Sequence, residues 1–124
     1  MEGRAVTFQV ELPTPISANH LFANRLGGRT KTKAYENWQT AAALTIVSAV
    51  RADRRIGGAV SIKIDLPEKC RLDIDNAVKP ILDALVCSQR IDDDRHVARL
   101  EVNKNARPGD MALVTVAAIS QVAA

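Results

Sequence analysis

The chain has 124 residues, of which 47% are hydrophobic and 25% charged, with a formal net charge of +3. This is the length of one domain and the balance of an ordinary globular protein, which excludes a disordered tail, a collagen-like repeat and a disulfide miniprotein. No apolar run approaches the ~20 residues that span a bilayer, and the N-terminus lacks the apolar segment of a signal peptide. We therefore expect a single cytoplasmic domain over residues 1–124 with no membrane segment.

Alternation of apolar and polar residues, the pattern of a half-buried strand, recurs four times along the chain. The four predicted strands cover residues 5–12, 59–66, 96–103 and 111–119. A turn at Pro108-Gly109-Asp110 separates the last two, which predicts that they pair as a hairpin. Residues 16–33 show no sustained period and contain Gly27-Gly28, which indicates a flexible loop.

Two stretches with helical spacing lie between these strands. The first helix is expected over residues 34–52, with Thr32 as its cap and an apolar stripe that includes Tyr35 and Trp38. The second is expected over residues 76–88, since Pro80 is tolerated only near the first turn of a helix. The order β-α-β-α-β-β predicts an α+β fold, in which two helices pack on a mixed four-stranded sheet.

Two carboxylates, Asp73 and Asp75, stand just before the second helix. In an extended chain residues two apart share a face, so these carboxylates would repel each other unless a cation lay between them. Carboxylate oxygens are the ligands of hard cations, so the pair is a candidate half-site for Mg²⁺ or Mn²⁺. The alternative is a polar loop in which Asp75 or Asn76 caps the helix.

Lys79 lies four residues after Asp75 and four before Asp83, so on a helix the three share a face. It is either a member of a surface ion-pair ladder or a cation that offsets negative charge on a phosphate in a transition state.

The run Asp92, Asp93, Asp94 follows the second helix and could fold back to supply a third carboxylate. Upstream, the stretch between His20 and Lys33 holds four cations and no acid. A basic stretch and a concentrated acid cluster together suit a protein that binds a polyanion and a metal cation. They also suit a solvated loop and a solvated turn.

The string Asp73-Ile-Asp75-Asn76-x-x-Lys79-x-x-x-Asp83-Ala-Leu, followed by Asp93-Asp94-Arg-His-Val97, resembles the RusA family of Holliday junction resolvases. The N-terminal part is similar too: a strand ending in prolines is followed by Asn19-His20, a basic loop and an amphipathic helix. The resemblance covers essentially the whole chain. Arg90 and Ile91 stand where the family often has an aromatic residue.

This resemblance implies a small homodimeric endodeoxyribonuclease that resolves four-way DNA junctions by paired, symmetric nicks, using Mg²⁺ or Mn²⁺, during DNA recombination and repair. Asp73 and Asp75 match its two metal-binding aspartates, Lys79 matches its essential lysine and Asp94 its third acid. Asp93 is the alternative candidate for the third acid, because the run of three aspartates allows the match to shift by one residue. Family members occur in phage and prophage contexts.

Contacts to DNA are expected from cations that meet phosphates and from polar side chains near them, so binding should weaken steeply with salt. The candidates are Asn19, His20, Arg25, Arg29, Lys31, Lys33, Arg71 and Asn76. Two alternatives stay open. One is a nuclease that acts on other branched DNA, such as flaps or forks, and the other is a non-catalytic relative that only binds junctions.

Overall fold

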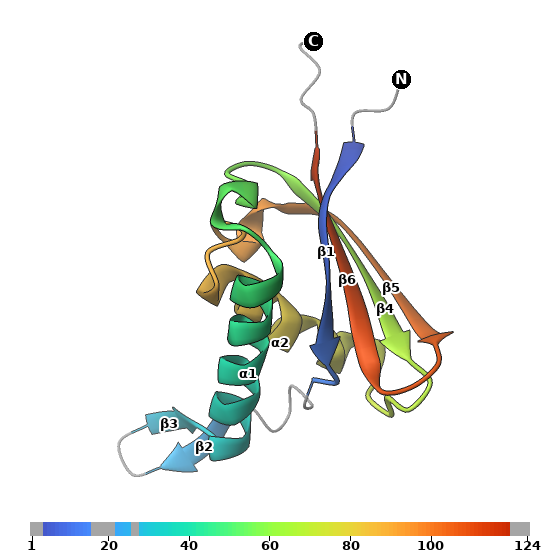
Figure 1. Ribbon diagram of the computed structural model, residues 1–124. Helices are drawn as coiled ribbons and strands as arrows, with labels where there is room; N and C mark the ends of the chain where they lie inside the picture. Colours follow the sequence, from blue (N-terminus) through green and yellow to red (C-terminus); the bar gives the residue numbers. More distant parts are fainter. Residues whose placement is uncertain (1–3, 16–21, 26–27, 120–124) are drawn as a thin grey trace.

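The structure, a computed structural model, describes residues 4–15, 22–25 and 28–119. Two helices lie on one side of a four-stranded sheet (Figure 1). The helices are α1 (Lys33–Ala49) and α2 (Ile74–Cys87). The strands of the sheet are β1 (Arg4–Pro13), β4 (Val60–Pro67), β5 (Val97–Arg107) and β6 (Met111–Ile119). Within the described ranges, no helix is long and apolar enough to cross a membrane.

The sheet is mixed and has the order β1-β6-β4-β5. β4 pairs parallel with β5, whereas β6 pairs antiparallel with both β1 and β4. This confirms the predicted α+β fold and its mixed four-stranded sheet. The predicted hairpin of the last two strands is wrong, because β4 lies between β5 and β6. The turn that joins them crosses the end of β4, where the Glu68 N–H donates to the Arg107 carbonyl at 2.7 Å.

The core lies between the sheet and the two helices. The predicted stripe of α1 is confirmed as far as Ile46, since Tyr35, Trp38, Ala42 and Ile46 are buried. Ala49, which the same spacing places in the stripe, is exposed. Alternate residues of the strands complete this apolar layer, which contains Phe8, Val10, Leu12, Ile62, Ile64, Val114 and Val116 among others. Thr32 caps α1 as expected, because its hydroxyl accepts a hydrogen bond from the Tyr35 N–H at 3.2 Å.

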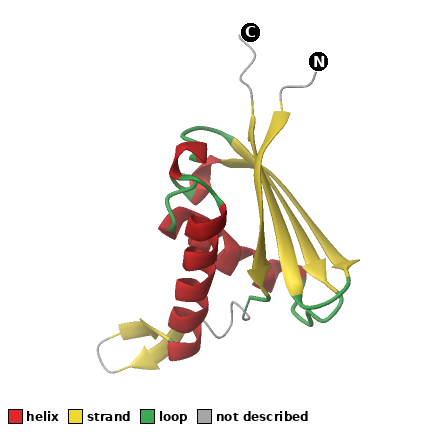
Figure 2. Cartoon of the chain, viewed as in Figure 1, coloured by secondary structure: helices red, strands yellow, loops and turns green. Residues whose placement is uncertain are grey.

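Part of the stretch that was expected to be loop is a small second sheet. β2 (Phe22–Arg25) and β3 (Gly28–Lys31) pair antiparallel beside the start of α1, at the lower left of Figure 2. The sequence here lacks an alternating apolar pattern, so periodicity gave no sign of these strands.

α2 begins at Ile74, two residues earlier than expected, and Pro80 therefore lies inside it. The Pro80 ring is buried, and its packing favours this placement over a later start. A proline has no N–H, so the carbonyl of Asn76, four residues earlier, receives no helical hydrogen bond from it. The first turn of α2 is consequently less constrained than the rest of the helix.

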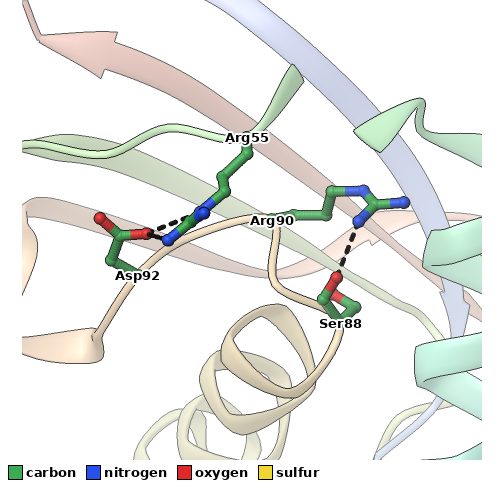
Figure 3. Close-up of polar contacts among 4 residues, drawn as sticks. All are labelled: Arg55, Ser88, Arg90 and Asp92. Atoms are coloured by element: carbon green, nitrogen blue, oxygen red, sulfur yellow. Dashed lines mark hydrogen bonds and ion pairs between the residues drawn. The ribbon is translucent and has the colours of Figure 1, made fainter. Parts of the chain in front are cut away.

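Two short turns of 3-10 helix complete the chain: η2 (Ala52–Arg54) follows α1, and η3 (Asp94–His96) precedes β5. The ends of α1 and α2 are fastened to each other by Arg90, whose buried guanidinium donates to the Val50 carbonyl at 2.8 and 3.1 Å. It also donates to the Ser88 carbonyl at 2.8 Å (Figure 3). Arg90 is thus a structural residue that ties the helix ends together.

Candidate active site

Asp73 and Asp75 lie at the start of α2, where the unpaired N–H groups of the helix favour negative charge. Asp73 occupies the N-cap position, but its side chain makes no capping hydrogen bond, and both residues are exposed. Within the described part of the chain, no hydrogen bond or ion pair engages either carboxylate. The expectation that both belong to extended chain is wrong for Asp75, which lies in the first helical turn.

Lys79 stands one helical turn further along and is half exposed. Its ammonium lies 3.4 Å from the Asp83 carboxylate. The same carboxylate accepts a hydrogen bond of 2.6 Å from the Tyr35 hydroxyl, which comes from α1. Asp83 therefore fixes the lysine by a contact that itself depends on the packing of the two helices.

The acid run after α2 has three different environments. Asp92 forms an ion pair with Arg55, whose Nε lies 2.8 Å from a carboxylate oxygen (Figure 3). Asp93 caps η3 by accepting a hydrogen bond of 3.0 Å from the Arg95 N–H. That hydrogen bond, another with the Asp94 side chain and the charge of Arg95 hold the pKa of Asp93 below its ordinary value. Asp94 is the exposed member of the run.

A second tether holds this run in place. The Ile56 N–H donates to the Arg90 carbonyl at 3.0 Å, and Ile56 and Ile91 form an isolated parallel bridge. Together with the Arg55–Asp92 ion pair, these contacts fasten the segment after α1 to the segment after α2.

The structure brings some of the candidate carboxylates together and leaves others apart. A hollow of about 370 Å³ is lined by Asp83, Asp93 and Asp94, with Gln39, Val86 and Cys87. Asp75 lines a different hollow, beside Leu100 of β5. Among the described residues, no three His, Cys, Asp or Glu side chains are grouped closely enough to hold a metal ion. Asp73, Asp75 and Asp94 therefore do not form one cluster in this structure.

The amino-acid sequence also matches a known protein family. A family model, Endodeoxyribonuclease RusA, matches residues 13–116, which span most of the sheet and both helices. The chain belongs to the RusA endodeoxyribonuclease family. A comparison with curated proteins found no match.

Because the chain belongs to the RusA family, it is by family a Holliday junction endodeoxyribonuclease. The substrate class that the family implies is branched DNA. The nucleases of this family are metal-dependent. The matched segment contains the whole motif from Asp73 to Asp94. The exposed carboxylates at the start of α2 lie within the residues that the family model matches.

The candidate DNA contacts divide by what the structure describes. Asn19 and His20 lie outside the described residues. The strands β2 and β3 carry Arg25, Arg29 and Lys31, of which only the backbone is described. Lys33 and Arg71 are exposed, whereas Asn76 is half-buried in the first turn of α2.

Sequence reasoning missed two features of this RusA site. Asp83 was placed as a partner of Lys79, but its hydrogen bond to Tyr35 joins residues 48 positions apart and has no sequence signal. Arg90 and Ile91 are both buried. An arginine followed by an apolar residue gave no indication of burial.

Proposed function

We propose that this chain is a single-domain, Mg²⁺- or Mn²⁺-dependent homodimeric nuclease that nicks four-way DNA junctions in symmetric pairs. The observation that carries the proposal is the pair of exposed carboxylates, Asp73 and Asp75, at the start of α2 within the RusA match. Neither is engaged by another described residue, so both are available to a cation.

The chemistry of these donors suits a hard divalent cation, although Asp94 lies apart from Asp75 in this structure. Mg²⁺ is commonly held by one or two carboxylates and keeps several water ligands, so Asp73 and Asp75 suffice as its core ligands. Asp94 is the proposed third ligand, in preference to Asp93, because the Asp93 carboxylate is committed to the cap of η3. When bound, such a cation supplies Lewis acidity to the scissile phosphate and to an attacking water.

The remaining residues bind and neutralise the DNA backbone. The Lys79 ammonium, held by Asp83, would offset negative charge that develops on the phosphate. Lys33 and Arg71 are exposed cations, and together with Arg25, Arg29 and Lys31 they would contact phosphates of the arms. Asn19, His20 and Asn76 are the proposed polar contacts.

The dimer follows from the substrate. A four-way junction has approximate two-fold symmetry, and two identical sites related by a two-fold axis can nick strands of like polarity. We place the activity in the cytoplasm, in recombination or repair of phage or prophage DNA.

A competition assay tests the proposal. A labelled four-way junction and a linear duplex of the same sequence are mixed with the protein at low salt, with Mg²⁺ or with EDTA. Paired nicks on the junction alone, lost in EDTA, are expected. Equal cutting of flaps or forks would favour the broader branched-DNA nuclease, and tight junction binding without cutting would favour a binding protein.

The variant Asp75→Asn tests the carboxylates. Cleavage should fall by about 100-fold or more, while junction binding is kept or tightened because a negative charge near phosphate is removed. Asp53→Asn is the matched control, since Asp53 is an exposed aspartate in η2 that pairs with Arg51. Cleavage by Asp75→Asn at the rate of the control would overturn the site.

A further inference from the structure

β5 is an open edge of the main sheet. Within the described part of the chain only β4 pairs with it (Figure 1). The strand is 11 residues long. The outer edge of such a strand carries N–H and C=O groups that can pair with another strand. Proteins usually cover, shorten or guard an edge of this length.

The helix-bearing face of this edge is apolar and incompletely covered. Leu100 and Val102 pair with Ile62 and Ile64 of β4, both fully buried, yet Leu100 is 43% exposed. Ile74 of α2 is 42% exposed. Together with Val78 and Asp75, these side chains line a hollow of about 490 Å³.

At the opposite edge of the sheet, the described side chains of β1 show no such exposed apolar surface. On β1 the residues of the same face, Phe8, Val10 and Leu12, are all buried. Among the described side chains of the two edge strands, the exposed apolar surface therefore lies on β5, which α2 covers incompletely.

The charges of β5 are arranged so that the strand complements itself. Two copies related by a two-fold axis perpendicular to the sheet can pair antiparallel with Leu100 opposite Leu100. Arg99 of each copy then stands opposite Glu101 of the other, on the solvent face. Centring the axis on Arg99 or on Glu101 would instead oppose like charges, which destabilises a strand pair.

Both charged side chains are available for such pairing. Arg99 is exposed and makes no hydrogen bond or ion pair within the described part of the chain. Glu101 is exposed and accepts a hydrogen bond of 3.0 Å from the Asn103 side chain. Charged side chains on an edge strand usually discourage pairing with another strand. The alternation of Arg99 and Glu101 instead favours pairing with a second copy of β5 in the register centred on Leu100.

We propose that two copies of this chain join through β5, antiparallel and centred on Leu100, to form a continuous eight-stranded sheet. The Leu100 side chains meet at the axis and cover the hollow between α2 and β5. Because Asp75 lines that hollow, the two proposed cation sites lie on either side of the axis. This interface would join the two subunits of the proposed homodimer. The existence of that dimer rests on the proposed function.

Charge reversal tests the register. The wild-type mass in solution should be twice 13.4 kDa. Arg99→Glu and Glu101→Arg each place two like-charged pairs across the axis, so each should raise the dimer dissociation constant tenfold or more. An equimolar mixture of the two variants restores both ion pairs and should return to the dimer mass. Leu44→Glu, at an exposed leucine of α1, is the control and should remain a dimer.

Light scattering after gel filtration gives the masses, and circular dichroism checks that each variant is folded. A wild type of 13.4 kDa would overturn both this interface and the proposed dimer. Single variants that stay dimeric would overturn the interface alone and leave the dimer and the nuclease proposal standing. Monomeric variants that fail to combine on mixing would overturn the Arg99–Glu101 pairing.

Discussion

The Tyr35 hydroxyl donates a hydrogen bond of 2.6 Å to the Asp83 carboxylate and thereby joins α1 to α2. Tyr35 is 1% exposed, so this bond lies at the edge of the core. The same carboxylate also pairs with Lys79, whose ammonium lies 3.4 Å from it. One carboxylate thus connects the interior of the protein to a cation of the candidate active site.

The first prediction concerns the ionisation of Tyr35. Burial, and then the hydrogen bond and negative charge of Asp83, raise the pKa of Tyr35 well above its ordinary value of 10.0. The folded protein holds this proton more tightly than the unfolded chain does. The stability that it contributes is therefore fully present below pH 10 and is lost as the pH rises beyond it.

Because Tyr35 is the sole tyrosine, tyrosinate absorbance reports on it alone. The absorbance should stay low as the pH passes 10 and should appear together with unfolding, followed by Trp38 fluorescence. A smooth titration centred at pH 10 in the folded protein would contradict the buried hydrogen bond.

The second prediction concerns Asp83→Asn. On helices an acid four residues before a lysine is the better order for an ion pair, which Asp75 and Lys79 have and Lys79 and Asp83 lack. Removing the Asp83 charge should therefore release Lys79 toward Asp75. We expect junction cleavage to slow by about tenfold with little change in junction affinity.

Single-turnover cleavage and gel-shift binding would separate the two effects of this change. Tyr35→Phe serves as the comparison, because it removes the hydrogen bond to Asp83 but keeps the ion pair. If Asp83→Asn lowers thermal stability and leaves the cleavage rate at the wild-type value, Asp83 acts on the fold alone.

The third prediction concerns Arg90→Lys. An ammonium has no planar fork and cannot reproduce the three hydrogen bonds that Arg90 makes to the Val50 and Ser88 carbonyls. The free energy of unfolding should fall by about 1.5–3 kcal/mol, measured by urea denaturation. Arg51→Lys, at an exposed ion pair with Asp53, should stay within about 0.5 kcal/mol of wild type.

The fourth prediction concerns the basic residues around β2 and β3. Each lysine or arginine that meets a phosphate contributes about one to the slope of log affinity against log salt. Lys33→Ala should therefore weaken junction binding at low salt and reduce that slope by about one. Arg54→Ala, at an exposed arginine of η2, is the comparison and should leave the slope unchanged. An unaltered slope in Lys33→Ala would remove Lys33 from the DNA contacts.

Local signals explain what could be predicted from the sequence. The first helix has a cap at Thr32 and a continuous apolar stripe, and both act within a few residues of the chain. The structure accordingly has α1 close to its expected bounds, although the helix ends at Ala49 because Val50 is already extended. The four strands of the main sheet were found for the same reason.

Features that depend on distant partners could not be read from the pattern. The position of β6 between β1 and β4 rests on pairing with strands that lie far away in the sequence. Pro80 lies inside α2 and is buried, although its ring cannot donate a helical hydrogen bond. The pairing of Tyr35 with Asp83 is likewise a tertiary contact.

For the candidate site, the motif located the carboxylates but gave the wrong local geometry. Asp75 lies within the helix, so the shared face that an extended chain would provide does not exist. The separate environments of Asp92, Asp93 and Asp94 come from Arg55 and from the cap of η3, which depend on the fold.

The position of β6 also has a consequence for synthesis. β1 and β4 belong to one sheet only because β6, the last strand along the chain, pairs with both. On a ribosome, the earlier strands would therefore emerge without their common neighbour. The sheet could close only once Met111–Ile119 had left the exit tunnel, so we expect this domain to fold after translation of β6 rather than progressively with it.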